Sequence, residues 1–138
     1  GGADIYTDVE MVRTGINKRK LASFGGAVHC RIQDPEIAAQ AKAQGVTRSL
    51  AAMRSFGAAL TGSVVAIGNA PTALFEVLRL VREEGVRPAC IVGIPVGFVG
   101  AADSKKAEDI VLIDLSGKTD VCDYFLICTG RSCQRDAL

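Results

Sequence analysis

Short apolar runs alternate with longer amphipathic segments along most of the chain. The run at residues 64–67 is apolar at every position, as strands of a parallel sheet are when both faces are buried. Regular alternation of such strands with helices is typical of βαβ units. The pattern therefore predicts an α/β fold with an open, mainly parallel sheet and helices on both faces, a doubly wound arrangement. The expected strands are residues 27–32, 63–67, 89–94, 110–114 and 124–128.

Helix signals fill the gaps between these strands. Asp34 is placed to cap a helix that has Pro35 at its first position and ends at Gly45. Thr47 is placed to cap the next helix. We also expect a short helix over residues 101–107.

A further helix follows residue 70 and ends at Gly85. Its apolar side chains repeat at i, i+3, i+4 and i+7, which predicts one buried face. These side chains are Leu74, Val77, Leu78 and Val81.

The length of 138 residues fits one domain. Lys and Arg total 16 against 15 Asp and Glu, which gives a net charge of +1. A surface that coats nucleic acid would need a clustered basic excess, so that class of partner is excluded. No apolar run approaches the ~20 residues that span a membrane, so we expect no membrane segment.

The chain starts Gly1-Gly2-Ala3-Asp4, without an initiator methionine or a signal segment. We interpret this start as the interior of a longer protein, and hence the domain as N-terminally truncated. Because nothing in the sequence points to export, we expect a cytoplasmic location.

The five cysteines are odd in number and irregularly spaced, which does not fit a disulfide framework. Cys30 and Cys90 lie in apolar runs and are predicted to be small core residues. Cys122, Cys128 and Cys133 cluster near the end of the chain, but no C-x-x-C pair occurs. We therefore expect no metal site.

Two strand-to-helix connections have the form that binds ligands in open parallel sheets. After the strand at 63–67, Gly68 allows a tight turn and Asn69 is placed to cap the helix that Pro71 begins. This helix start would offer free N–H groups and partial positive charge to a carboxylate or phosphate. A well-capped turn without a ligand explains the same residues, and both interpretations stay open.

The second connection, residues 95–100, has Gly97 and Gly100 three apart, which is half of a dinucleotide fingerprint. Glycines needed for a tight turn are an equal explanation.

Arg48 falls in the first turn of the helix that Thr47 caps, where the helix dipole disfavours a cation. A bound carboxylate would explain this placement, and an ordinary surface arginine is the alternative.

The sequence alone does not identify any of the remaining titratable residues as catalytic. His29 is the single histidine and lies in a strand, where we expect a structural role. Asp8 and Glu10 are either an acid–base pair or acidic residues that complement the dipole of a helix they open. No Ser-His-Asp or Cys-His arrangement can be built, so the catalytic residue stays unknown.

Four segments together resemble the precorrin-8X methylmutase family in order and spacing. The resemblance covers roughly residues 2–105, and its last two segments are highly specific. The segments are residues 5–16, 45–53, 65–75 and 87–102.

The resemblance implies an isomerase of cobalamin biosynthesis that is homodimeric, has its active site near the subunit interface and needs no cofactor. The family moves a methyl group between neighbouring carbons of the corrin ring and turns precorrin-8X into hydrogenobyrinate, or acts on the cobalt-containing counterpart. The substrate carries many carboxylates, which Arg48 and helix N-termini are suited to receive. The residues in matching motifs that we place near the tetrapyrrole are Thr7, Asp8, Met11, Thr47, Arg48, Ser49, Asn69 and Gly97.

The chain departs from the family in two places. The family's catalytic histidine precedes the motif that contains Asp8, and His29 does not correspond to it. Without that general acid, which typically contributes ~10²–10⁴-fold, we expect weak catalysis. A non-catalytic fragment that binds a corrinoid is therefore an alternative.

The second departure is the tail. Residues 105–115 and 123–130 resemble the start of the Iojap, or ribosomal silencing factor, family. We expect a partial methylmutase-like domain over residues 1–105 and a partial Iojap-like segment over residues 106–138, which leaves ribosome interaction as another alternative. The apolar run at 110–114 is our candidate for the final strand of the mutase sheet.

Overall fold

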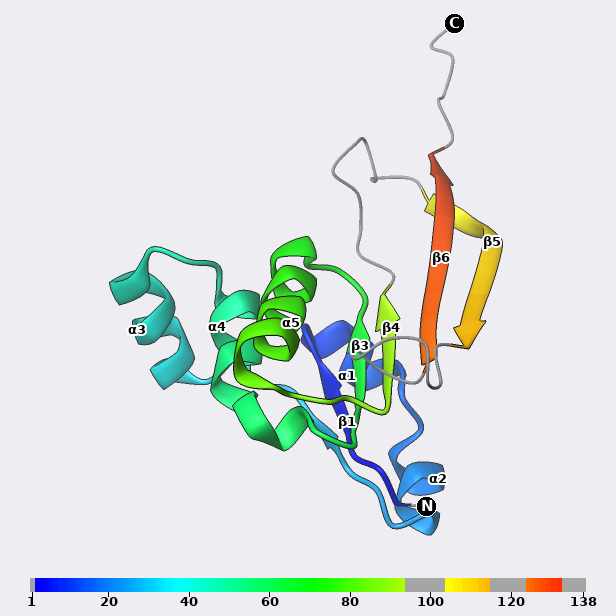
Figure 1. Ribbon diagram of the computed structural model, residues 1–138, viewed down its shortest axis with the longest axis horizontal. Coiled ribbons are helices and arrows are strands. Elements are labelled where there is room, and N and C mark those ends of the chain that lie inside the picture. Colours follow the sequence, from blue (N-terminus) through cyan, green and yellow to red (C-terminus); the bar gives the residue numbers. More distant parts are fainter. Residues whose placement is uncertain (1, 94–103, 115–123, 133–138) are drawn as a thin grey trace, which may run out of the picture.

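The computed structural model describes residues 2–93, 104–114 and 124–132, and within these ranges six strands form one sheet (Figure 1). Its order is β2-β1-β3-β4-β6-β5. All neighbouring pairs are parallel except β5 and β6, which are antiparallel at one edge. The prediction of an open, mainly parallel sheet is confirmed. The strands are β1 (Ile5–Thr7), β2 (Val28–His29), β3 (Val64–Ile67), β4 (Cys90–Gly93), β5 (Ser104–Asp114) and β6 (Tyr124–Ser132).

Helices connect the parallel strands in a doubly wound pattern. The chain moves from β1 outward to β2, then returns past β1 to β3 and continues to β4. Because such crossovers are right-handed, the helices after β1 cover one face and those after β2 and β3 cover the other. Figure 1 shows α4 and α5 side by side. The helices are α1 (Glu10–Gly15), α2 (Lys18–Ser23), α3 (Pro35–Gln44), α4 (Arg48–Phe56), the 3₁₀ turn η1 (Gly57–Leu60) and α5 (Pro71–Glu84).

The predicted helix ends are largely confirmed. Gly45 and Gly85 follow α3 and α5 with φ of 65° and 69°, the left-handed conformation that favours glycine. Thr47 caps α4 by accepting the N–H of Leu50 at 3.2 Å. Asp34 stands at the N-cap of α3, but the prediction that its side chain caps the helix is wrong. Its carboxylate instead accepts a hydrogen bond from Arg31 Nε at 2.8 Å.

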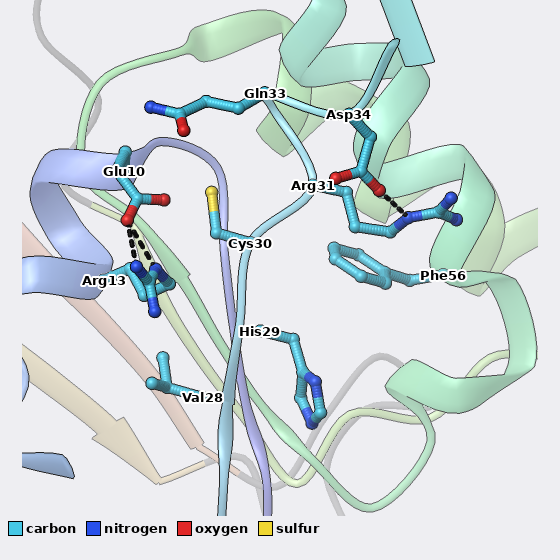
Figure 2. Close-up of a pocket in the computed structure, with 9 residues that line it drawn as sticks. All are labelled: Glu10, Arg13, Val28, His29, Cys30, Arg31, Gln33, Asp34 and Phe56. Carbon is cyan, nitrogen blue, oxygen red and sulfur yellow. Dashed lines mark hydrogen bonds and ion pairs between the residues drawn. The ribbon is translucent and has the colours of Figure 1, made fainter. Parts of the chain in front are cut away.

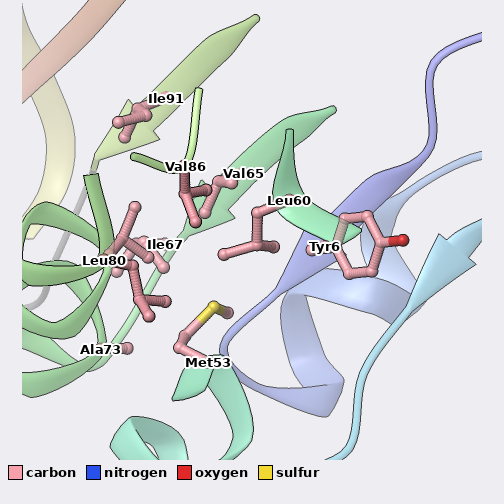
Figure 3. Close-up of a cluster of buried hydrophobic side chains, with 10 residues drawn as sticks. Tyr6, Met53, Leu60, Val65, Ile67, Ala73, Leu80, Val86 and Ile91 are labelled. Atoms are coloured by element: carbon pink, nitrogen blue, oxygen red, sulfur yellow. The ribbon is translucent and has the colours of Figure 1, made fainter. Parts of the chain in front are cut away.

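The main core lies between one face of the sheet and α4, η1 and α5 (Figure 3). Alternate residues of the strands, among them Val65 and Ile91, are fully buried there, and Met53 and Leu60 cover them from the helical layer. Full burial of a side chain of this size contributes about 1.5–3 kcal/mol. The intervening strand residues on the opposite face are only partly buried; they are Ile5, Val64, Ala66, Cys90 and Val92.

The C-terminal strands differ from the sequence prediction. Residues 104–107, expected in a short helix, belong to β5, because their backbone pairs with β6 through a register shift. The strand next to β4 is β6, and the 110–114 run, our candidate for a final strand of the sheet, is part of β5 at its outer edge. The proposed domain boundary at residue 105 falls inside β5.

Candidate functional site

The strand order creates one topological switch point, between β1 and β3. These strands are parallel neighbours, with Thr7 opposite Ala66, yet β1 leads to β2 and β3 leads to β4 in opposite directions. In open α/β sheets, ligands bind in the crevice outside the carboxyl ends of two such strands. Strand β4 ends at the same edge, with Gly93 opposite Ile67. The candidate site therefore lies where β1, β3 and β4 end.

Asp8 follows β1 directly and contacts the end of β3. Its side chain is fully buried. Oδ1 accepts the N–H of Gly68 at 3.0 Å, and Oδ2 accepts the N–H groups of Asn69 at 2.9 Å and Ala70 at 2.7 Å. The carboxylate thus bridges the two strand ends and satisfies the backbone donors that lead into α5.

This contact corrects the prediction that Asn69 caps α5. The N-cap residue is Ala70, which offers no side-chain hydrogen bond, and the anion at this helix start comes from Asp8. A carboxylate near a helix N-terminus is favourable because it complements the helix dipole. The anion-binding turn that the sequence suggested is therefore filled by the chain's own side chain.

Thr7 is also buried and holds the strand ends together. Its hydroxyl donates to the carbonyl oxygen of His29 at 3.2 Å, which ties β1 to β2. The side chains of Thr7 and Asp8 are thus buried and bonded to the protein itself.

The start of α4 forms one wall of the site. Thr47 Oγ1 and Thr72 Oγ1 lie 2.8 Å apart, so the first turns of α4 and α5 are joined. Arg48 is exposed and has no hydrogen bond or ion pair with any residue that the structure describes, whereas Ser49 is buried. Thr72 was not singled out from the sequence, because nothing local in the sequence shows that it meets Thr47.

The exposed surface near the switch point is partly apolar. Met11, in α1, is 71% exposed. Asn69 is exposed, and its side-chain amide has no partner among the described residues. Gly97 lies outside the residues that the structure describes.

A groove runs along the edge strand β2, next to this site (Figure 2). Its volume is about 360 Å³. Figure 2 shows Glu10 paired with Arg13 on one side of β2, and Arg31 paired with Asp34 near Phe56 on the other. The Arg13 guanidinium lowers the pKa of Glu10. This groove could not be predicted from the sequence, because its charged pairs are local and its walls come from three separate segments.

Cys30 and His29 also line the groove. The predicted core position of Cys30 is only partly right, since the residue is half-buried, and burial raises the pKa of its thiol. His29 stacks on Tyr6 with ring centroids 4.7 Å apart, and its Nε2 lies 2.9 Å from Asp4 Oδ2. The hydrogen bond with His29, followed by that from the Ala27 N–H, lowers the pKa of Asp4. His29 is therefore engaged in joining β2 to β1.

The described residues contain no group of three or more metal-ligating side chains. None of the helices in the described part of the chain is long and apolar enough to cross a membrane.

Together, the strand order and the helices on both faces define a doubly wound α/β protein whose candidate site lies at the switch point. The sequence matches the precorrin-8X methylmutase family over residues 1–118. The chain belongs to that family.

Individual relatives agree with this assignment. A precorrin-8X methylmutase from Sinorhizobium sp is 51% identical over 106 residues, which cover 77% of this chain and 50% of the relative. A cobalt-precorrin-8 methylmutase from Leptospira interrogans is 41% identical over 132 residues, 94% of this chain and 58% of the relative. The chain thus spans about half the length of the curated relatives it matches.

Solved structures give the same fold. A precorrin-8X methylmutase related protein superimposes with a TM-score of 0.69 at 35% identity, covering 94% of this chain and 62% of that one. The precorrin-8x methyl mutase from Thermus thermophilus gives a TM-score of 0.67 at 30% identity, with 95% and 59% covered. The likeness of the tail to the Iojap family and the division of the chain at residue 105 stay predictions.

Proposed function

We propose that this chain carries the corrinoid-binding edge of a precorrin-8X methylmutase and takes part in moving a methyl group within the corrin ring to give hydrogenobyrinate. The observation that carries the proposal is the switch point between β1 and β3 in a chain of this family. The joined starts of α4 and α5 carry Arg48, a cation that pairs with none of the residues that the structure describes. Met11 adds an exposed apolar side chain.

These residues suit the two kinds of surface that a corrinoid acid presents. The macrocycle is a broad apolar plane, and Met11 offers a large, adaptable apolar contact for it. The carboxylates at the periphery need cationic donors, and the planar guanidinium of Arg48 binds a carboxylate through two hydrogen bonds. Asn69 adds an amide that both donates and accepts.

We propose no residue of this sequence as the proton donor. His29 bonds to Asp4 and stacks on Tyr6, so it is held at β2 by contacts with the segment that includes β1. The family's catalytic histidine precedes the Asp8 motif, and we assign its role to no residue of this sequence. The reaction as the resemblance implies it needs no cofactor.

The proposal includes the further properties that the resemblance implies. The substrate is precorrin-8X or its cobalt form, and relatives named for each are similar to this chain. The protein acts as a homodimer in the cytoplasm. Light scattering of the purified chain tests the dimer.

Titration with hydrogenobyrinate, followed through the visible absorption of the corrin, tests the binding site. We expect saturable binding that weakens about tenfold in Arg48→Ala, since a hydrogen bond between charged groups contributes about 1.5–3 kcal/mol. Arg82→Ala is the matched control, because Arg82 is an exposed arginine in the last turn of α5. Equal affinity in both variants would remove Arg48 from the site.

A single-turnover assay with precorrin-8X then separates the alternatives. Product formation supports a methylmutase, and binding without turnover supports a non-catalytic corrinoid-binding fragment. Absence of any corrinoid binding by the wild-type chain overturns the proposed function.

A further inference from the structure

The turn at residues 68–70 contacts the segment that follows β1 in two places. First, the Asp8 carboxylate accepts three consecutive N–H groups of this turn, at 2.7–3.0 Å. Second, Val12 lies directly against Gly68, so that a Cβ at residue 68 would collide with Val12 Cγ2. The position of the turn is therefore tied to this segment by both contacts.

Asn69 is the middle residue of this turn. Its backbone N–H points to Asp8, while its side chain is exposed and has no partner among the described residues. Hydrogen bonds to an ionised carboxylate are about twice as strong as those between neutral groups. Three of them on adjacent residues fix the backbone, and with it the direction in which the Asn69 side chain leaves the turn.

We propose that Asp8 is a positioning residue, whose buried carboxylate holds the 68–70 turn so that the Asn69 side chain is presented to the corrinoid. The inference rests on the proposed function for the identity of the ligand. It also indicates which groups of the candidate site bind the carboxylates of the ligand. Because Asp8 already occupies the donors before α5, the carboxylates of the ligand are received at Arg48 and the start of α4.

Asp8→Asn is the direct test, because it keeps the size of the side chain and removes the charge. An amide has one accepting oxygen, so at least one of the three N–H groups faces an NH₂ donor instead. We expect hydrogenobyrinate to bind about tenfold more weakly, because the turn then loses at least one of the hydrogen bonds that hold it. In amide NMR spectra, the signals of Gly68, Asn69 and Ala70 should shift the most.

A double-mutant cycle separates positioning from general destabilisation. If Asp8 acts through Asn69, then Asn69→Ala and Asp8→Asn each weaken binding, and the double variant is no weaker than the worse single variant. Losses that multiply in the double variant overturn the positioning role. Asp4→Asn is the matched control: Asp4 also accepts a loop N–H, that of Ala27 at 2.9 Å, but at the opposite end of β1. It should leave corrinoid affinity unchanged.

A second pair of variants tests the same turn if Asp8→Asn does not fold. Gly68→Ala should displace the turn and weaken binding, because the new methyl group meets Val12. Adding Val12→Ala removes the colliding Cγ2 and should restore at least half of the lost affinity. Full affinity in Gly68→Ala alone overturns the proposal.

The two proposals fail in different ways. If the wild-type chain binds no hydrogenobyrinate, the proposed function fails, and the amide shifts in Asp8→Asn still report whether Asp8 holds the turn. If the wild type binds but the cycle is additive, the positioning role fails and the proposed function stands.

Discussion

Thr47 and Thr72 join the first turns of α4 and α5 through a hydrogen bond of 2.8 Å between their hydroxyl groups. Thr47 also accepts the N–H of Leu50, so one hydroxyl both caps α4 and fixes it beside α5. Thr47 therefore helps to position the start of α4, which carries Arg48.

Thr47→Ala should lower the free energy of unfolding by about 1 kcal/mol, the usual contribution of a Thr cap. Thr47→Ser keeps the hydroxyl and should lie close to the wild type. Urea denaturation of the three proteins measures the difference. A Ser variant as unstable as the Ala variant would show that the methyl group of Thr47, and not the cap, carries the stability.

The sequence predicted those parts of the fold that local signals determine. Gly45 and Gly85 mark helix ends because a left-handed residue is needed there, and Thr47 marks a helix start because a short hydroxyl side chain reaches the N–H three residues on. The continuous apolar run of β3 likewise reflects burial between neighbouring strands. These signals are enough for the α/β class and the parallel sheet.

The sequence did not predict contacts between distant residues. Asp8 and Ala70 are separated by 62 positions, and no local pattern shows that one caps the turn of the other. The apolar repeat in α5 predicted that Leu74 and Leu78 are buried, but both are only partly buried. The buried face instead includes Glu76, a charged residue that periodicity assigns to the surface. Its burial depends on the hydrogen bonds that Arg54 and Arg79 donate to its carboxylate.

Gly85→Ala should destabilise the protein by about 1–2 kcal/mol, because a residue with a side chain resists the φ of 69° found there. Gly15→Ala is the contrasting change. Gly15 is in α1, its φ is not positive and its added methyl group meets no atom within 4 Å. It should stabilise the protein by about 0.4–1 kcal/mol through the unfolded state. Thermal unfolding of both variants tests this, and equal effects would contradict the conformational argument.

The thiols of Cys30 and Cys90 should react slowly in the folded protein at neutral pH. Burial raises the pKa of both, and only the thiolate is a good nucleophile. Iodoacetamide labelling with peptide mass mapping measures each site. We expect little modification at neutral pH, an increase as the pH passes the ordinary thiol value of 9.0, and full modification after unfolding. Rapid labelling of folded Cys30 at neutral pH would show a thiolate that the structure does not explain.

Glu76 should make the stability of the protein depend on pH in the acid range. Its carboxylate is 3% exposed and accepts hydrogen bonds from Arg54 Nε at 2.9 Å and Arg79 Nη2 at 2.6 Å. Burial alone would raise the pKa of Glu76, but the hydrogen bonds from Arg79 and Arg54 outweigh it, and the pKa lies below the ordinary value of 4.5. A carboxyl group with a lowered pKa stabilises the folded state above its unfolded-state pKa, and this contribution disappears as the pH falls through the folded-state value.

Glu76→Gln tests this directly. At neutral pH we expect a loss of about 1–2 kcal/mol, less than for a fully buried pair because both arginines are about one-third exposed. As the pH falls below 4.5, the wild type should lose its advantage and the two stabilities should converge. Glu83→Gln is the control on the same helix, since Glu83 also pairs with Arg79 but is 63% exposed, and it should change stability little at any pH. A gap between wild type and Glu76→Gln that stays constant through this range would show that the ionisation of Glu76 does not cause the difference in stability.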